Sequence, residues 1–126
     1  GIISPYAAQV RLLQEEYAKV FPSSRGDQKR NYLDYSEEDK MDELEIRSVD
    51  GFQGREKEMI ILCTVRSNTR GEIGFVADPR RLNVGITRAK RGLVVLGNRR
   101  TLSVSGVWRD WFKWVDKNKC TLDDVR

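Results

Sequence analysis

Histidine is absent from the 126 residues of this chain, and cysteine and proline are scarce. Without histidine the chain can build neither a Ser-His nor a Cys-His catalytic pair, and it lacks a common nitrogen ligand of zinc, so we expect no metal site. Its two cysteines are too few for a disulfide framework, which favours a reducing compartment, the nucleus or the cytoplasm. No apolar run approaches the roughly 20 residues of a membrane-spanning helix, so we expect no membrane partner.

The composition that remains is that of an ordinary globular domain, with 39% hydrophobic and 33% charged residues. The net charge of +4, from 23 Lys and Arg against 19 Asp and Glu, is too small to indicate a polyanionic partner by itself. Residues 1–126 suit one domain. The chain opens on Gly1 in what reads as a strand, so we interpret it as a fragment of a longer protein. We also expect a monomer.

Hydrophobic periodicity predicts alternating strands and helices. We expect strands at residues 2–3, 44–49, 59–65 and 92–97, and helices at about 5–21, 79–90 and 107–117. Ser4-Pro5 and Asp78-Pro79 each combine a good N-cap residue with proline at the first helical position. The runs at 59–65 and 92–97 are typical of strands buried on both faces of a parallel sheet. This order predicts an α/β fold with a mostly parallel sheet flanked by helices, and a long flexible loop at about 23–43.

The predicted helix at 79–90 has an apolar side and a basic side. At about 100° per residue, the arginines of this segment fall opposite its apolar residues, and these arginines are Arg80, Arg81, Arg88 and Arg91. Their mutual repulsion would be relieved by an anion, and the guanidinium fork matches phosphate oxygens. A solvated basic face, ion-paired with acidic residues of the 23–43 segment, explains the same pattern equally well.

Residues 50–57 form a turn-rich loop in which Gly51 and Gly54 allow a tight bend and close approach to a ligand. The loop follows a strand, and α/β sheets bind ligands beyond the carboxyl ends of their strands; the alternative is a plain connecting turn. A Walker A loop is missing, because the nearest candidate, Gly92 to Gly97, has a strand-like apolar interior and no lysine. The aromatic residues at 108–114 have helical spacing, which favours core packing over a base-stacking platform.

Three segments resemble motifs of superfamily 1 helicases, in the family's order. Residues 49–58 resemble motif V, residues 80–90 resemble motif VI, and Ser4-Pro5-Tyr6 with Gln9 resembles a Thr-Pro-Tyr-x-x-Gln segment. Residues 65–68 and 74–75 also fit the 1B branch, the up-frameshift/senataxin-like family. Two departures are mild: Ser4 replaces threonine, and Gly85 replaces alanine, which should weaken the helix by up to ~1 kcal/mol.

The resemblance implies a motor of two RecA-like domains with ATP in the cleft between them. This chain would be the second domain, a three-layer P-loop NTPase-type fold without its own Walker A, so ATP and Mg²⁺ would be held mainly by the first. By analogy with motif VI, Arg88 would be the catalytic arginine finger and a nucleotide contact. By analogy with motif V, Gly54 and Glu56 would lie beside the sugar and phosphate end of the nucleotide.

The resemblance also implies a track for single-stranded RNA or DNA. Its expected contacts, which position the strand without reading its sequence, are Ser4, Tyr6, Ser48 and Asn83. The implied function is that of the C-terminal motor domain of an ATP-dependent 5′-to-3′ helicase, inactive without the upstream RecA-like domain of the same chain. The alternatives are a nucleic-acid-binding α/β module that does no chemistry and a degenerate motor domain that serves as a scaffold.

Overall fold

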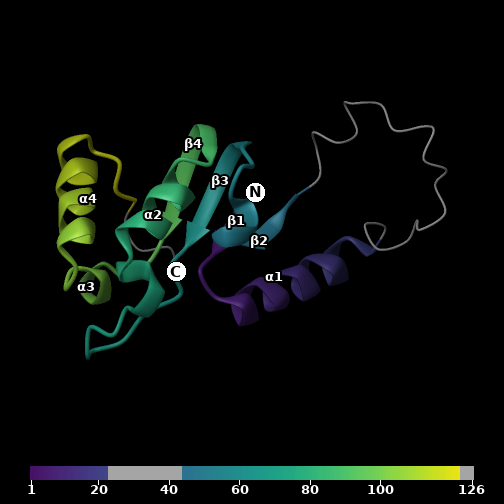
Figure 1. The fold of residues 1–126 in the computed structure, drawn as a ribbon, viewed down its shortest axis with the longest axis horizontal. Coiled ribbons are helices and arrows are strands. Elements are labelled where there is room, and N and C mark those ends of the chain that lie inside the picture. The colour runs from purple at the N-terminus through teal and green to yellow at the C-terminus, as the bar shows by residue number, and fades with distance from the viewer. Residues whose placement is uncertain (23–43, 123–126) are drawn as a thin grey trace.

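The computed structural model describes residues 1–22 and 44–122, which fold around a four-stranded sheet (Figure 1). Its strands are β1 (Ile2–Ser4), β2 (Ile46–Ser48), β3 (Lys57–Cys63) and β4 (Ala89–Leu96), in the order β2-β1-β3-β4. Every neighbouring pair is parallel: Ile2 lies beside Ile46 and Ile61, and Ile61 lies beside Val94. The predicted parallel α/β sheet is confirmed. The loop expected at 23–43 lies outside the described residues.

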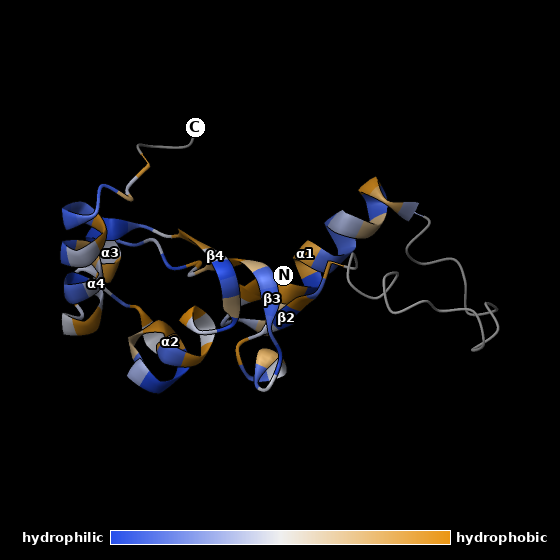
Figure 2. Cartoon of the chain, turned by 90° about the horizontal axis from the view of Figure 1, so that it is seen from above, coloured by the Kyte–Doolittle hydropathy of each residue, from blue (hydrophilic) through white to orange (hydrophobic). Residues whose placement is uncertain are grey.

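Helices lie on both sides of the sheet, as Figure 2 shows for α1 and α2. The helices are α1 (Ala7–Val20), α2 (Pro79–Ile86), α3 (Arg99–Leu102) and α4 (Gly106–Lys117), with 3₁₀ turns η2 (Asp50–Phe52) and η3 (Gly74–Ala77). On one side α1 contacts β2, where Gln14 Nε2 donates to the Ile46 carbonyl at 2.8 Å and Val10 is buried. The three-layer RecA-like arrangement follows from this placement of helices. None of the described helices is long and apolar enough to cross a membrane.

The main core lies between the sheet and the layer formed by α2, α3 and α4. Its largest fully buried side chain is Trp108 of α4, whose Nε1 donates to the Val76 carbonyl at 2.8 Å. Trp111 and Phe112 pack against this core, whereas Trp114 is 55% exposed. The interpretation of the C-terminal aromatic residues as core packing is therefore confirmed for Trp108 and its two half-buried neighbours.

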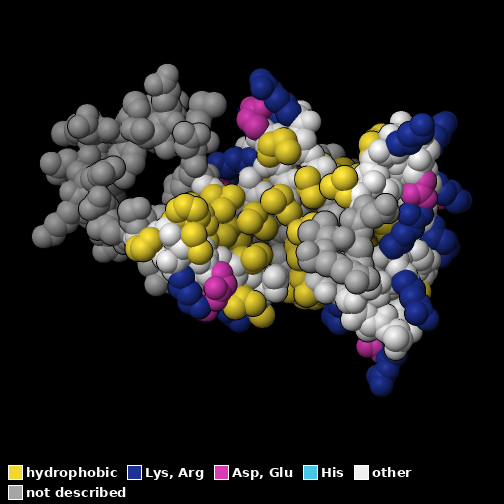
Figure 3. All heavy atoms as spheres, turned by 180° about the vertical axis from the view of Figure 1, so that it is seen from behind, with side chains coloured by type: hydrophobic (Ala, Val, Ile, Leu, Met, Phe, Trp, Pro, Cys, Tyr) yellow, Lys and Arg dark blue, Asp and Glu magenta, His cyan; other side chains and the backbone are white. Residues whose placement is uncertain are grey.

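The other face of β3 and β4 is exposed, which corrects one expectation. Successive strand residues point to opposite faces, so Ile60 and Leu62 enter the core while Ile61 points away. The outward residues are more than a third exposed, namely Met59, Ile61, Val94 and Leu96. Figure 3 shows hydrophobic side chains gathered on the side of the sheet away from α2. Among the described helices only α1 lies on this side, and it covers the β2 end, so burial on both faces was wrong for β3 and β4.

The helix expected to run to residue 90 ends at Ile86 instead. The Lys57 N–H donates to the Arg88 carbonyl at 3.1 Å, and Ala89 pairs with Lys57. The chain therefore leaves the helix and pairs with β3 from this point. Lys90 and Arg91 consequently lie on β4, where both pair with Glu58 of β3, at 3.9 and 2.9 Å. The predicted basic helix face is therefore wrong: α2 carries only Arg80 and Arg81.

The two proline-containing helix starts differ. Asp78 is the N-cap of α2, and its carboxylate accepts the Arg80 N–H at 2.9 Å, as predicted. Ser4 is not an N-cap, because it belongs to β1 and pairs with Ser48. The first helix begins only at Ala7, after Tyr6, with no side-chain cap. Strand pairing of Ser4 has therefore overridden its capping tendency.

Candidate functional site

The residues expected beside a nucleotide lie at the amino edge of the sheet. Gly54 and Glu56 come directly before β3, and Arg88 comes directly before β4. In a parallel sheet these strand starts share one edge, and the Lys57–Arg88 backbone bond joins them. The loop of residues 50–57 begins at the carboxyl end of β2 but crosses to the opposite edge. A ligand at Gly54 would thus lie away from the carboxyl edge where the sequence had placed it.

Arg88 bridges the end of α2 and the Gly54 loop. Its Nε donates to the Val84 carbonyl at 3.1 Å and its Nη2 to the Thr87 hydroxyl at 2.9 Å, while Nη1 reaches the Arg55 carbonyl at 3.4 Å. Nη1 and Nη2 each carry two N–H groups, and on each nitrogen the second N–H has no partner among the described residues. The guanidinium is thereby oriented by main-chain oxygens and keeps open donors for an anion.

Gly54 and Glu56 present an open surface beside Arg88. Gly54 has φ +76°, and a Cβ added there would meet none of the described residues within 4 Å, so the backbone bend, and not a neighbouring side chain, requires glycine. Glu56 is exposed and has no hydrogen-bond or ion-pair partner among the described residues. Its carboxylate is free to accept a bond from a hydroxyl or a guanidinium. Nowhere in the described part do three or more Cys, Asp or Glu side chains gather as a metal site would need.

A carboxylate that sequence reasoning missed holds this loop in place. Glu45, just before β2, binds Arg47 at 2.9 Å, Arg55 at 2.8 Å and Lys57 at 3.2 Å. Burial alone would raise the pKa of Glu45, but the hydrogen bond and charge of Lys57, with the neighbouring arginines, outweigh it and lower the pKa. The ion pairs fix Arg55 and Lys57 on both sides of Glu56. No spacing in the sequence indicated this cluster, because its members come from β2 and the residue before it, from the loop, and from the start of β3.

The residues expected to face a strand of nucleic acid lie mostly at the carboxyl edge. Ser48 ends β2 and is half-buried, and its hydroxyl accepts the Gly51 N–H at 3.1 Å. Ser4 ends β1 but has no exposed surface, and its hydroxyl accepts the Tyr6 N–H at 3.4 Å. Ser4 therefore supports the turn at Tyr6, and its contact with a nucleic-acid strand stays a prediction. Asn83 is exposed in the middle of α2, and no described contact joins it to the other three.

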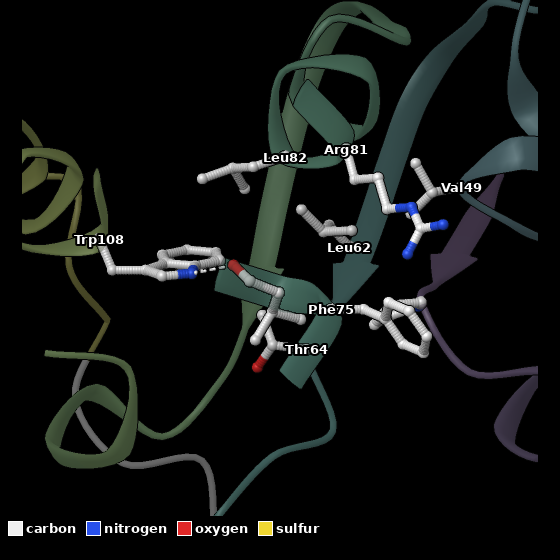
Figure 4. Close-up of a pocket in the computed structure, with 9 residues that line it drawn as sticks. Val49, Leu62, Thr64, Phe75, Arg81, Leu82 and Trp108 are labelled. Atoms are coloured by element: carbon white, nitrogen blue, oxygen red, sulfur yellow. Dashed lines mark hydrogen bonds between the residues drawn. The ribbon is translucent and has the colours of Figure 1, made fainter. Parts of the chain in front are cut away.

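Tyr6 belongs to a group of four side chains that we call the Phe75 cluster: Tyr6, Arg66, Phe75 and Arg81. The Tyr6 hydroxyl accepts from Arg66 Nε at 2.6 Å and donates to the Ile73 carbonyl at 3.3 Å. The Tyr6 and Phe75 ring centroids are 6.1 Å apart, and the Arg81 guanidinium lies 4.5 Å from the Phe75 centroid (Figure 4). Only Tyr6 of these four was singled out as a site residue, although residues 65–68 and 74–75 carried a signal in their family resemblance.

Comparisons with known proteins agree with this layout. A family model described as an AAA domain matches residues 1–100. ATP-dependent helicase NAM7 of Saccharomyces cerevisiae is 44% identical across the whole chain, and Helicase SEN1 of the same yeast is 37% identical over 95% of it. DNA-binding protein SMUBP-2 of Mesocricetus auratus is 44% identical over 82% of the chain. This chain belongs to the superfamily 1B helicases.

The superfamily 1B relatives are far longer than this chain, which spans 12% of NAM7, 8% of SMUBP-2 and 5% of SEN1. NAM7 is an ATP-dependent helicase and SMUBP-2 is a DNA-binding protein, so the family combines nucleotide and nucleic-acid binding. At the amino edge of this sheet Arg88 lies beside the Gly54 loop, and at the carboxyl edge Tyr6 and Ser48 follow the ends of β1 and β2.

Proposed function

We propose that residues 1–126 are the second RecA-like motor domain of an ATP-dependent 5′-to-3′ helicase that acts on single-stranded RNA or DNA. The observation that carries the proposal is the position of Arg88, held by main-chain oxygens beside the Gly54 loop with open N–H donors. An arginine in this setting suits the role of an arginine finger, which acts on a nucleotide held by another domain. The domain works as part of a monomer in the nucleus or cytoplasm and does not hydrolyse ATP alone.

The residues at the amino edge fit the terminal phosphate and sugar of ATP. When bound, ATP supplies the phosphoryl transfer to water that drives the motor. Arg88 stabilises negative charge on the transferred group, a contribution worth about 10³-fold or more in related phosphoryl-transfer enzymes. Glu56 is an anion and so is suited to a ribose hydroxyl, while Gly54 lets the backbone approach. ATP and Mg²⁺ are held mainly by the upstream RecA-like domain.

The carboxyl edge forms part of the single-strand track. Tyr6, Ser48 and Asn83 remain the proposed contacts, and the buried Ser4 acts through the turn that it supports. Contacts of this kind position a backbone without selecting bases, which suits translocation along any sequence. The alternative, a binding module without chemistry, predicts no loss of ATPase activity when Arg88 is changed.

The decisive experiment replaces Arg88 by alanine in the intact protein. We expect the ATPase kcat to fall by about 10³-fold, while strand affinity without nucleotide changes less than about twofold. Arg91→Ala is the matched control, because this arginine is three residues away, highly exposed and paired with Glu58. It should leave both quantities near wild type. Equal loss of ATPase activity and strand affinity would make Arg88 a nucleic-acid contact, and unchanged ATPase activity would end the finger assignment.

A further inference from the structure

Phe75 is a large apolar side chain that the fold turns outward. It is 54% exposed, although its neighbour Val76 is buried and anchored through its carbonyl by Trp108, and Ile73 is buried on the other side. Gly74 makes this possible with φ +53°, since a Cβ there would lie 3.0 Å from Arg66 Nη2 and 3.1 Å from the Tyr6 hydroxyl oxygen. The backbone is thus fixed on both sides of Phe75, which holds its ring at the surface.

Arg66 keeps hydrogen-bonding capacity beside this ring. Its guanidinium lies 4.9 Å from the Tyr6 centroid and uses Nε to bind the Tyr6 hydroxyl. Within residues 1–22 and 44–122 its Nη groups have no hydrogen-bond partner, and no carboxylate pairs with it. Val65, the preceding residue, has φ +66°, which β-branched residues rarely adopt and which is typical of functional sites when it occurs. Val65 lies in a tight turn, because the Arg66 N–H donates to the Thr64 carbonyl at 2.7 Å.

The chemistry of the Phe75 cluster suits single-stranded nucleic acid better than a protein partner. Bases stack on exposed aromatic rings, and a free guanidinium binds the phosphate next to them. A protein partner would need a recess for an anchoring side chain. The cavity behind Phe75, lined by Val49, Leu62 and Leu82 among others, measures about 20 Å³, enough for one water-sized group. Arg81 is partly neutralised by Asp50 at 3.9 Å, so it supports the ring while Arg66 remains the open cation.

We propose that the Phe75 cluster is a stacking subsite for one base of the bound strand, in which Phe75 stacks on the base and Arg66 binds the adjacent phosphate. The inference rests on the proposed strand-binding function and deepens it. Tyr6 stays beside the strand in this arrangement, but its hydroxyl is already used by Arg66 and the Ile73 carbonyl. Tyr6 therefore orients Arg66 and flanks Phe75, and the phosphate contact belongs to Arg66.

The first test measures binding of the intact protein to an oligothymidine strand and an oligouridine strand. Phe75→Ala should weaken both about tenfold, the loss typical of one base–aromatic stack. Phe21→Ala is the matched control, since Phe21 is 51% exposed, lies 4.9 Å from the Tyr17 ring and ends α1 away from the cluster. It should change affinity less than about twofold. An unchanged affinity for Phe75→Ala, in a wild-type background that binds, overturns this inference alone, whereas a wild type without strand affinity overturns the proposed function.

Two further readouts separate stacking from a structural role of the ring. On a fully abasic sugar–phosphate strand, Phe75→Ala should bind as tightly as wild type, because no base remains to stack. A tenfold loss there too would show that the ring only supports the fold.

Arg66→Gln should reduce the slope of log affinity against log salt by about 0.7, the value for one phosphate on a single strand, and Arg66→Lys should restore it. An unchanged slope in Arg66→Gln would remove the phosphate contact from the proposal.

Discussion

Replacing Gly85 by alanine should stabilise the domain, and the structure gives the size of the effect. Gly85 lies in α2 with ordinary helical φ and is buried. An added Cβ would meet Leu62 methyls at 3.4 and 3.6 Å, which is van der Waals contact without overlap. The change from glycine to alanine in a helix contributes about 1 kcal/mol, and burial of one methyl adds up to about 0.8 kcal/mol. We therefore expect a gain of about 1–2 kcal/mol in the free energy of unfolding.

Urea unfolding followed by circular dichroism measures this gain as a higher midpoint at unchanged m-value. Gly71→Ala is the opposite control, because the chemical change is the same but Gly71 has φ +70° and its Cβ would lie 2.5 Å from a Val104 methyl. That variant should lose stability. A destabilised Gly85→Ala would mean that Leu62 cannot accommodate the methyl, and the packing of α2 on β3 would have to be tighter than the contact distances state.

Two other changes test the core and the ion pairs of Glu45 with Arg47, Arg55 and Lys57, which we call the Glu45 clamp. Trp108→Phe should cost about 2–3 kcal/mol in unfolding free energy, because it removes the 2.8 Å bond to the buried Val76 carbonyl and leaves a void, whereas Trp114→Phe on the exposed side of α4 should cost less than about 0.5 kcal/mol. Equal costs would contradict the burial of Trp108. The pKa of Glu45 is lowered in the folded state, so its stabilisation is present above its ordinary pKa near 4.5 and is lost as pH falls through the lowered value. Glu45→Gln should therefore be less stable than wild type at neutral pH, and urea titrations should show the difference shrinking below about pH 4; a difference independent of pH would exclude the clamp.

The sequence predicted the parallel strands and the Asp78 cap because these depend on local pattern. It placed the end of α2 wrongly because Thr87 to Lys90 continue a helical period, and only pairing of Ala89 with Lys57, far away in the chain, decides where β4 begins. It also could not tell which faces of an apolar strand are covered. That depends on which helices pack there, and Ile61 and Leu62 look alike in sequence.

The candidate site divides in the same way. Arg88, Gly54 and Glu56 could be chosen as candidates from short motifs, and the structure adds the hydrogen bonds that orient Arg88. The Phe75 cluster was not recognisable, because Tyr6 and Arg66 are 60 residues apart and meet only when β1 and β3 lie side by side. The ion pairs of Glu45 could not be predicted for a similar reason, because its partners Arg55 and Lys57 lie on the following loop and strand.

One short helix joins the two proposed ligand surfaces. Arg81, near the start of α2, contacts Phe75 at the carboxyl edge, while Arg88 follows the end of α2 at the amino edge and binds the Val84 carbonyl. The eight residues of α2 span about 12 Å. Because backbone hydrogen bonds join its successive turns, the helix moves as a unit. Under the proposed function, a pull on Arg88 by a nucleotide therefore displaces Arg81 and the ring beneath it. The contact that senses the phosphate and the contact that holds a base would then shift together, which a translocating motor requires.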